Sequence, residues 1–393
     1  MSPASTPALF QPIQVGDITL AHRVVLAPQT RYRADTAHVH TGLGVEFYEQ
    51  RASVPGTLLI TEATYISAQA SGQAFAPGIW NDAEISAWKK ITEAVHAKGS
   101  YIYLQLWALG RAARPKVFHA EFPDYPYVSA SDIPLSTSPT EIPRPLTKDG
   151  MCIQLLHLTL SFMPRIFTEI KEYIQWYGQA ASNAVDRAGF DGVELHGANG
   201  YLVDQFLQDV SNHRTDEYGG SIENRARFVF EVMDAIVAAV GQSKTAIRLS
   251  PWSKYQDMRM DDPVPTFTYV VKQLKERYPK LAYLHTVTPL APANQGPEDP
   301  SQADFMDKLW APNPVITTGG YTRDSGLKTA EETGRIIGYG VLFTANPDLP
   351  FRLEKNLPMN ELELPTLYAK GFEQGYTTYP FSPEFLQQQQ SKQ

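Results

Sequence analysis

The chain has 393 residues, of which 43% are hydrophobic and 19% are charged, a balance that excludes a chain that stays disordered. The formal net charge of −8 argues against a protein that binds nucleic acid or an anionic membrane surface. Cys152 is the only cysteine, so an internal disulfide is excluded and a reducing compartment is expected.

No targeting or membrane-spanning signal stands out along the chain. The start, MSPASTPALF, lacks the basic residues and apolar core of a signal peptide. The longest apolar stretch, 151–163, is shorter than the roughly 20 residues that a transmembrane helix needs. We therefore expect a cytoplasmic protein without a membrane partner.

In chain order, short runs rich in β-branched and aromatic residues alternate with stretches of helical periodicity. The predicted strands are 24–27, 56–61, 101–106, 192–196, 245–249, 282–286, 315–318 and 338–343. The predicted helices are 82–98, 169–188, 223–240, 266–277 and 325–333. This alternation predicts the α/β class and a (β/α)8 TIM barrel, formed as a single domain over residues 1–393.

One long region interrupts the repeat after the third strand. Residues 111–170 include a Pro- and Ser-rich piece at 122–145, and structureless regions of this length usually either form functional lids or are disordered. We expect a lid or insertion here. The C-terminal residues 386–393, mostly glutamine, are expected to form a flexible tail.

A polar cluster follows the fourth predicted strand, in GFDGVELHGANGYLVDQF. His196 stands at the strand end, and Asn199 and Tyr201 follow within five residues. An imidazole and a carboxamide can both donate hydrogen bonds to one carbonyl oxygen, and a phenol can deliver a proton to carbon. This set suits the reduction of an α,β-unsaturated carbonyl compound. For the isolated pattern, however, a buried structural histidine followed by a tight turn and a buried Tyr201 is the favoured interpretation.

Several separated segments resemble one family. They are VVLAPQTRYRA, LLITEATYIS, APGIW, LQLWALGR, HGANGYLVDQFLQDVSNHRTDEYGGSIENRARF, AIRLSP and GYGVLFTANPDLPFRLEK. They cover nearly the whole chain in family order, and the chain therefore resembles the Old Yellow Enzyme family, fungal type. The resemblance implies an FMN-dependent NADPH dehydrogenase or ene-reductase, acting on a small enone or enal as a monomer or homodimer.

The resemblance also implies roles for individual residues. His196 and Asn199 would bind the substrate carbonyl, Tyr201 would protonate the carbon beside it, and Tyr368 would line the substrate pocket. The residues implied to bind FMN are Pro28, Thr30, Ala63, Gln105, Arg248, Gly319, Gly320 and Gly340. Among these, Thr30 would contact a flavin carbonyl, Gln105 the pyrimidine edge, Arg248 the edge that becomes anionic on reduction, and the glycines the phosphate. Each of these three side chains also has a structural alternative. Thr30 could cap a helix or loop, Gln105 could be a strand-end amide that satisfies backbone groups, and Arg248 could form a structural ion pair.

Two features depart from the family. Val341 follows Gly340 where the family usually has an arginine, so the phosphate would lose a bidentate partner and FMN affinity is expected to fall. Residues 150–168, GMCIQLLHLTLSFMPRIFT, match no family motif. They are either translated intron sequence or a natural insertion that forms a lid or a dimer contact.

Two other functions compete with the ene-reductase. The first is a pathway-specific reductase or isomerase of an unsaturated aldehyde in fungal secondary metabolism, where Tyr201 would favour reduction. The second is a non-redox barrel, for example a metal-dependent hydrolase using His196. We expect no metal site, because no HExxH or comparable ligand spacing is present.

Overall fold

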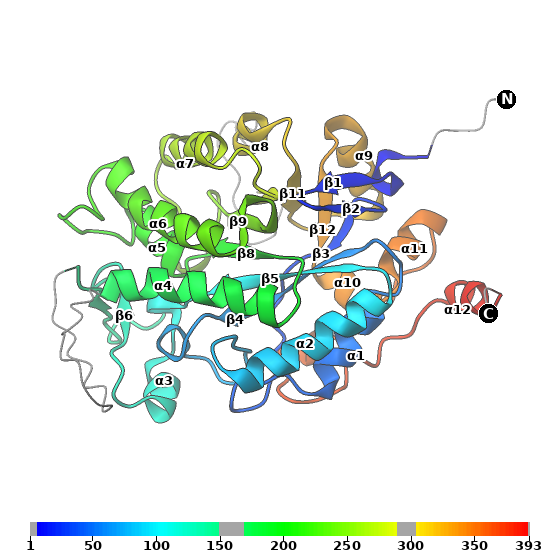
Figure 1. Ribbon diagram of the computed structural model, residues 1–393, viewed down its shortest axis with the longest axis horizontal. Coiled ribbons are helices and arrows are strands. Elements are labelled where there is room, and N and C mark those ends of the chain that lie inside the picture. The colour runs from blue at the N-terminus through cyan, green and yellow to red at the C-terminus, as the bar shows by residue number, and fades with distance from the viewer. Residues whose placement is uncertain (1–5, 149–168, 289–303, 392–393) are drawn as a thin grey trace.

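The computed structural model describes residues 6–148, 169–288 and 304–391, and at its centre these residues form a closed barrel of eight parallel strands (Figure 1). Neighbouring strands follow one another in chain order around the ring, and the last pairs with the first. The strands are β3 (Val24–Leu26), β4 (Leu58–Tyr65), β5 (Tyr101–Trp107), β8 (Gly192–Gly197), β9 (Thr245–Leu249), β10 (Tyr283–Val287), β11 (Val315–Thr318) and β12 (Ile336–Tyr339). The predicted (β/α)8 barrel is confirmed.

The longer helices surround the barrel and bury apolar side chains against it. In α2, Ile85, Trp88 and Val95 share the buried face, and a capping box between Asn81 and Glu84 fixes the helix start. The larger helices are α1 (Gly42–Arg51), α2 (Asp82–Ala97), α4 (Glu169–Ser182), α6 (Ile222–Val240), α7 (Val264–Arg277) and α9 (Arg323–Thr333), and the short α8 (Phe305–Trp310) lies before β11. The other short helices are α3 (Pro115–Glu121), α5 (Leu202–Leu207), α10 (Val341–Ala345), α11 (Leu349–Lys355) and α12 (Pro383–Gln390), and a π-helical turn, Asn183–Arg187, follows α4.

An N-terminal hairpin closes one end of the barrel. Its strands β1 (Ile13–Val15) and β2 (Ile18–Leu20) pair antiparallel. Val15 and Ile18 belong to a buried cluster with Val25 and Tyr103, which lie on barrel strands near their amino ends. The opposite end, where the strands finish, is therefore the open face on which a site can form.

The region after β5 contains more local structure than the sequence suggested. It holds α3 and two short paired strands, β6 (Val128–Ser129) and β7 (Arg144–Pro145). Residues 150–168 lie outside the described part of the chain. The residues on either side of them meet, because Glu169 accepts a hydrogen bond from the Thr147 backbone nitrogen at 2.9 Å and pairs with Arg144.

Two predicted elements were wrong. The predicted strand 338–343 is instead β12, which ends at Tyr339, followed by α10. The apolar residues after Gly340 therefore continue the chain as a helix at the barrel rim, beyond the residues that pair with β11 and β3.

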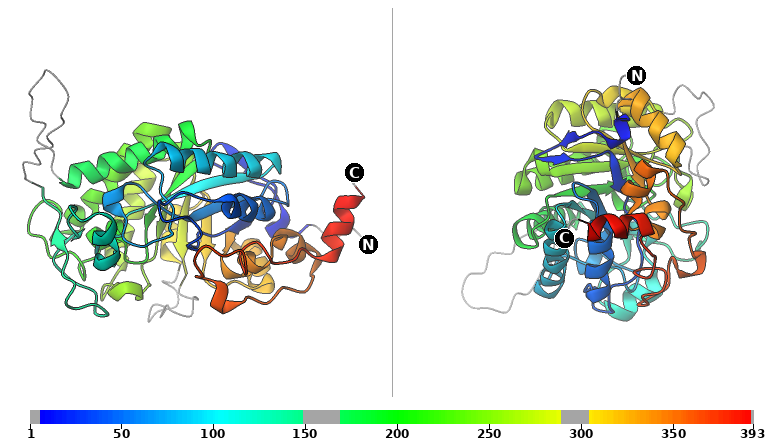
Figure 2. Two further views of the ribbon diagram at one scale, coloured as in Figure 1. Left: turned by 90° about the horizontal axis from the view of Figure 1, so that it is seen from below. Right: turned by 90° about the vertical axis from the view of Figure 1, so that its right-hand side faces the viewer.

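The predicted flexible tail 386–393 is also wrong for its described part, since α12 runs to Gln390. Ser382 caps the helix by accepting from the Phe385 backbone nitrogen. Phe385 lies 5.4 Å from the ring of Phe351 in α11, so α12 packs at the edge of the molecule against that helix (Figure 2).

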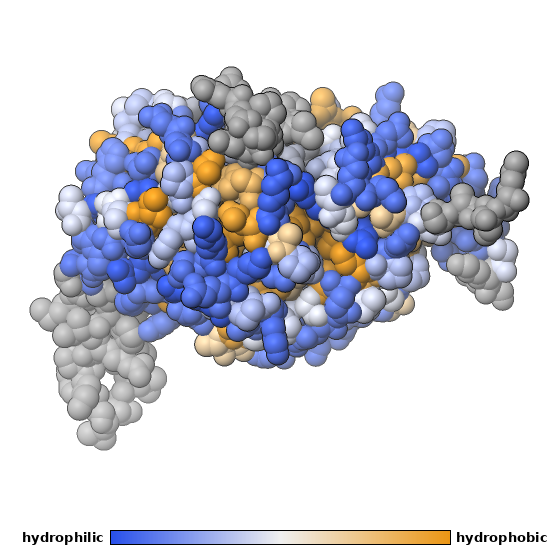
Figure 3. All heavy atoms as spheres, turned by 90° about the horizontal axis from the view of Figure 1, so that it is seen from above, coloured by the Kyte–Doolittle hydropathy of each residue, from blue (hydrophilic) through white to orange (hydrophobic). Residues whose placement is uncertain are grey.

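Among the described helices, none combines the length and apolar character that crossing a bilayer requires. Hydrophilic side chains cover most of the face seen in Figure 3, and a band of apolar side chains crosses its centre. Exposed large apolar side chains include Val341 and Tyr368, at 45% and 59% exposure, and both border the cavities described below.

Candidate active site

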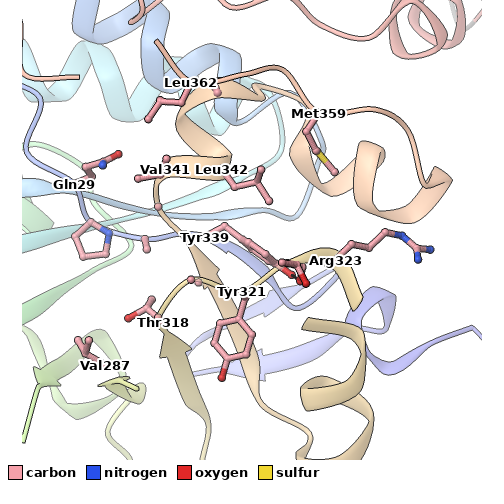
Figure 4. Close-up of a pocket in the computed structure, with 18 of the residues that line it drawn as sticks. Gln29, Val287, Thr318, Tyr321, Arg323, Tyr339, Val341, Leu342, Met359 and Leu362 are labelled. Carbon is pink, nitrogen blue, oxygen red and sulfur yellow. Dashed lines mark hydrogen bonds between the residues drawn. The ribbon is translucent and has the colours of Figure 1, made fainter. Parts of the chain in front are cut away.

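A cavity of about 650 Å³ opens at the carboxyl ends of the strands (Figure 4). This volume is in the range of small-molecule and cofactor sites. Five residues that the sequence assigned to FMN line it, namely Pro28, Arg248, Gly319, Gly320 and Gly340. The C-terminal segment adds Met359, Asn360 and Leu362, which sequence reasoning missed.

The glycines of this cavity allow the backbone to come close to a ligand. Gly319 and Gly320 have φ values of +151° and +84°, and a Cβ atom on Gly319 would lie 2.1 Å from Thr288 Oγ1. At Gly340, by contrast, a Cβ atom would meet nothing within 4 Å. The space beside the Gly340 backbone is therefore open to a ligand, as a phosphate cradle requires.

The described cations that line this cavity are Arg248 and Arg323. The Arg323 side chain points away from Val341 and Thr318 (Figure 4), and its Nε donates to the Leu353 carbonyl oxygen at 2.7 Å. Val341, half-exposed at the start of α10, adds no charge. With Arg248 assigned to the ring edge, a phosphate beside Gly340 would therefore rely on backbone donors.

His196 and Arg248 occupy paired positions on β8 and β9. The His196 side chain is buried, and burial lowers its pKa well below the usual value, so the imidazole is neutral. Its Nδ1, like Nε of Arg248, is a buried nitrogen without a hydrogen-bond partner among the described residues. Both groups are available to a bound molecule.

The chain turns sharply after His196 and places the next two predicted residues beside it. Asn199 has φ +58°, and its backbone nitrogen donates to Ser250 Oγ at 2.8 Å while its carbonyl accepts from Gln256 Nε2 at 2.7 Å. These two bonds hold the left-handed conformation, which asparagine tolerates better than most residues. The Asn199 carboxamide takes no part in them.

Tyr201 precedes α5 and faces the imidazole. Its ring centroid lies 4.9 Å from that of His196 and 5.0 Å from that of Trp107, in edge-on contacts. Burial raises the pKa of the Tyr201 phenol above its usual value, so the group stays protonated at neutral pH. One strand end and turn thus bring His196, Asn199 and Tyr201 close together, although none of them lines the 650 Å³ cavity.

Beneath these groups lies a buried polar chain that sequence reasoning missed. Gln105 Nε2 donates to Glu194 Oε1 at 2.7 Å, and His285 Nδ1 lies 2.8 Å from Glu194 Oε2. His285 Nε2 lies 3.3 Å from Thr318 Oγ1, and Arg248 Nη2 donates to the same hydroxyl at 3.4 Å. Two of the predicted FMN residues, Gln105 and Arg248, are therefore linked through Glu194.

The pKa values of Glu194 and His285 in this hydrogen-bonded network follow from their burial and from the groups that they contact. Burial alone would raise the pKa of Glu194, but His285, Arg248 and Gln105 outweigh it, and the pKa falls below its usual value. Burial is also the main cause that lowers the pKa of His285. Glu194 is thus ionised. Because Gln105 donates its amide nitrogen to the carboxylate, its carbonyl oxygen is left as an acceptor for a ligand.

One signal in the sequence could have revealed Glu194. It stands two residues before His196 in an otherwise apolar strand, so both side chains point to the same face of β8. A charged residue sharing a strand face with a candidate catalytic residue is expected to point into the barrel. Its partner His285, 91 residues away, has no such local signal.

The remaining predicted residues lie apart from the 650 Å³ cavity. Ala63 pairs in register with Gln105 and packs with Trp107, at the carboxyl end of β4. Thr30 lies half-buried in the loop after β3. Tyr368 is exposed, lies 6.1 Å from the Tyr32 ring, and lines a second cavity.

The observed donor set suits FMN. Open backbone beside Gly340 can receive a phosphate, and the unpartnered Nε of Arg248 suits the edge of the ring that becomes anionic. The free Gln105 oxygen can accept from a ring N–H. Within the described chain, no three His, Cys, Asp or Glu side chains form a group that could hold a metal ion.

Comparisons with known proteins agree with this geometry. Residues 8–360 match the model of the NADH:flavin oxidoreductase / NADH oxidase family. The chain is 47% identical to a chanoclavine-I aldehyde reductase of Penicillium roqueforti, covering 96% of this chain and 97% of that protein. It is 44% identical to an NADP-dependent oxidoreductase of Aspergillus flavus, over 96% and 97% of the two chains. Its fold is similar to the crystal structure of Old Yellow Enzyme from Pichia sp., with a TM-score of 0.83, 36% identity, and 97% and 95% coverage.

Proposed function

The chain belongs to the NADH:flavin oxidoreductase / NADH oxidase family and is an FMN-dependent oxidoreductase, and we propose that it uses NADPH to reduce the activated C=C bond of an unsaturated aldehyde or ketone. The observation that carries this proposal is the grouping of His196, Asn199 and Tyr201 next to Arg248 at the open end of the barrel. The same grouping rests on β8 and on the backbone contacts of the following turn, so it is held before a ligand arrives.

Each residue has a task that its surroundings allow. FMN, when bound, supplies the hydride that adds to the β-carbon of the substrate. His196, neutral through burial, and the Asn199 carboxamide donate to the substrate carbonyl oxygen and stabilise the negative charge that develops there. Tyr201, kept protonated by burial, delivers its proton to the α-carbon. The product gains one hydride and one proton across the former double bond.

Gln105 and Arg248 would position the FMN ring from the barrel strands β5 and β9. The Gln105 carbonyl oxygen, turned away from Glu194, accepts from the pyrimidine ring, and Arg248 faces the edge that gains negative charge. Thr30, Ala63 and Pro28 would complete the wall around the ring, and Gly319, Gly320 and Gly340 would contact the phosphate.

A narrower substrate class is the second candidate. The relative from Penicillium roqueforti is named for an aldehyde that it reduces, and 47% identity over nearly the whole chain favours an unsaturated aldehyde of fungal secondary metabolism for this chain too. Isomerisation is less favoured, because a proton donor at Tyr201 traps the reduced carbon before hydride can return.

Stopped-flow kinetics of Tyr201→Phe test the proposal. Reduction of bound FMN by NADPH should keep its rate, while reoxidation by cyclohexenone or cinnamaldehyde should slow by roughly 10² to 10⁴. Tyr255→Phe is the matched control, because Tyr255 lies near Tyr201 but is 55% exposed. Equal slowing of both half-reactions in Tyr201→Phe would show that Tyr201 is not the proton donor. A folded protein that never retains added FMN would overturn the function.

A further inference from the structure

A second cavity, of about 230 Å³, lies beside the active site and carries positive charge. Its walls come from the loop after β3 (Tyr32), the segment before α2 (Gln73), the start of α3 (Arg114) and the C-terminal segment (Tyr368, Lys370). The two cations are the charged residues of this lining, which holds no carboxylate among the described residues.

Both cations lack an anionic partner within the described chain. Arg114 and Lys370 are exposed, and neither forms an ion pair or a side-chain hydrogen bond with another described residue. Lys370 Nζ instead lies 5.4 Å from the ring centroid of Phe75. In a protein of net charge −8, two unpaired cations facing one small cavity provide a local site for an anion.

The other lining residues provide a flat surface and one more donor. Tyr32 and Tyr368 meet edge to face with centroids 6.1 Å apart. The Tyr32 hydroxyl donates to Gln73 Oε1, which leaves the Gln73 amide nitrogen as a donor among the lining residues. Two aromatic rings beside two cations and an amide suit a ligand that joins a planar ring to a phosphate.

Tyr32 connects this cavity to the catalytic residues. It packs, together with Tyr201, against the buried cluster that contains Trp107 and Ala63. Arg114 lies close enough to the Tyr32 phenol to oppose the effect of burial, which raises the pKa of Tyr32 to about 12. A ligand held at Arg114 would therefore extend from the rim of the same mouth in which Tyr201 lies.

We propose that this basic cavity, lined by Arg114, Lys370, Tyr32, Tyr368 and Gln73, binds the 2′-phosphate and adenosine end of NADPH. The inference rests on the proposed function, because the nicotinamide of the same molecule must reach the FMN site. The 2′-phosphate is a dianion near neutral pH, and Arg114 and Lys370 supply the charge that it needs. NADH has no phosphate at this position, so the cavity would make the enzyme prefer NADPH.

The test compares the two nucleotides in Arg114→Gln, Lys370→Gln and the double variant. Anaerobic stopped-flow measurements give the efficiency of FMN reduction by NADPH and by NADH. The ratio of the two efficiencies should fall at least about tenfold in each single variant and further in the double variant. Lys116→Gln, which removes the same charge from an exposed position in α3 outside the lining, should keep the wild-type ratio.

A direct binding measurement separates this proposal from the function on which it rests. Calorimetric titration with adenosine 2′,5′-bisphosphate should show binding to the wild-type protein and its loss in the double variant. If that binding is found but neither nucleotide reduces FMN, the cavity assignment stands and the proposed function fails. An unchanged ratio in the double variant overturns the proposal, as does an equal fall in Lys116→Gln. A loss of affinity for carboxylate-bearing enones, with the nucleotide ratio unchanged, would assign the cavity to an acidic substrate instead.

Discussion

Replacing Val341 by arginine should tighten the binding of FMN. Val341 begins α10, lines the 650 Å³ cavity next to Gly340, and is 45% exposed, so a longer side chain has room to turn toward the phosphate. A bidentate arginine would add two charge-assisted hydrogen bonds, worth about 1.5 kcal/mol each at the low end of their range. Ordering the side chain opposes them with roughly 1.5 kcal/mol of lost rotamer entropy.

The net gain of about 1.5 kcal/mol corresponds to a dissociation constant roughly tenfold lower. Recovery of flavin fluorescence on serial dilution measures this constant, and Val341→Leu is the control for size without charge. The gain should shrink as ionic strength rises, because the new interaction is between charges near the surface. Equal dissociation constants for Val341→Arg and Val341→Leu would show that the phosphate does not lie beside Gly340.

Three further predictions concern charge and chain continuity. Glu194→Gln should raise the midpoint potential of bound FMN, because Arg248 then faces the reduced ring with less compensation from the buried carboxylate; a potentiometric titration that finds an unchanged or lower potential contradicts this. His96 bonds Asp191 at 3.0 Å and its pKa is raised, so His96→Gln should lower the free energy of unfolding below pH 6.5, and the difference should vanish as pH rises through the folded-state pKa. Urea unfolding at pH 5.5 and 9 checks the sign, and an equal loss at both values counts against it. Deleting residues 150–168 should leave the melting temperature within a few degrees, because Thr147 and Ile170 already meet across the gap at 3.3 Å; loss of cooperative unfolding would show that the segment is needed.

The barrel could be predicted because its strands are buried on both faces and have clear limits in the sequence. The runs 245–249 and 315–318 coincide with β9 and β11 for this reason. The error at 338–343 arose because an apolar run continues through Val341 and Phe343, and a short run cannot distinguish a strand from a helix. Only the pairing of β12 with its neighbours shows that the strand ends at Tyr339.

The C-terminal helix α12 could not be predicted from its local sequence. A glutamine-rich end has adequate helix propensity but no periodic apolar face, and α12 is fixed by contact between Phe385 and Phe351 from an earlier helix. Contacts between residues far apart in the sequence leave no mark on composition.

The candidate site also has a part that the sequence could predict and a part that it could not. His196, Asn199 and Tyr201 lie within six residues of one another, so a single strand and turn bring them together. The link from Gln105 through Glu194 and His285 joins three strands, and the cavity of Arg114 and Lys370 joins the loops before α3 and near the C-terminus. Residues of these kinds are too frequent in any sequence to be paired without the fold.

The arrangement of charges around the FMN site differs from that in a site that has an arginine after Gly340. Arg248 is linked through Thr318 and His285 to the carboxylate of Glu194, so part of its field is compensated within the barrel. With Val341 uncharged, neutral backbone donors at Gly319, Gly320 and Gly340 carry more of the phosphate binding. A backbone N–H that donates to a phosphate also makes a charge-assisted hydrogen bond, but it adds no positive charge, so salt screens it less than an exposed ion pair. FMN binding by this chain should therefore be weaker than with an arginine at position 341 and less sensitive to ionic strength, because little of its affinity comes from an exposed charge.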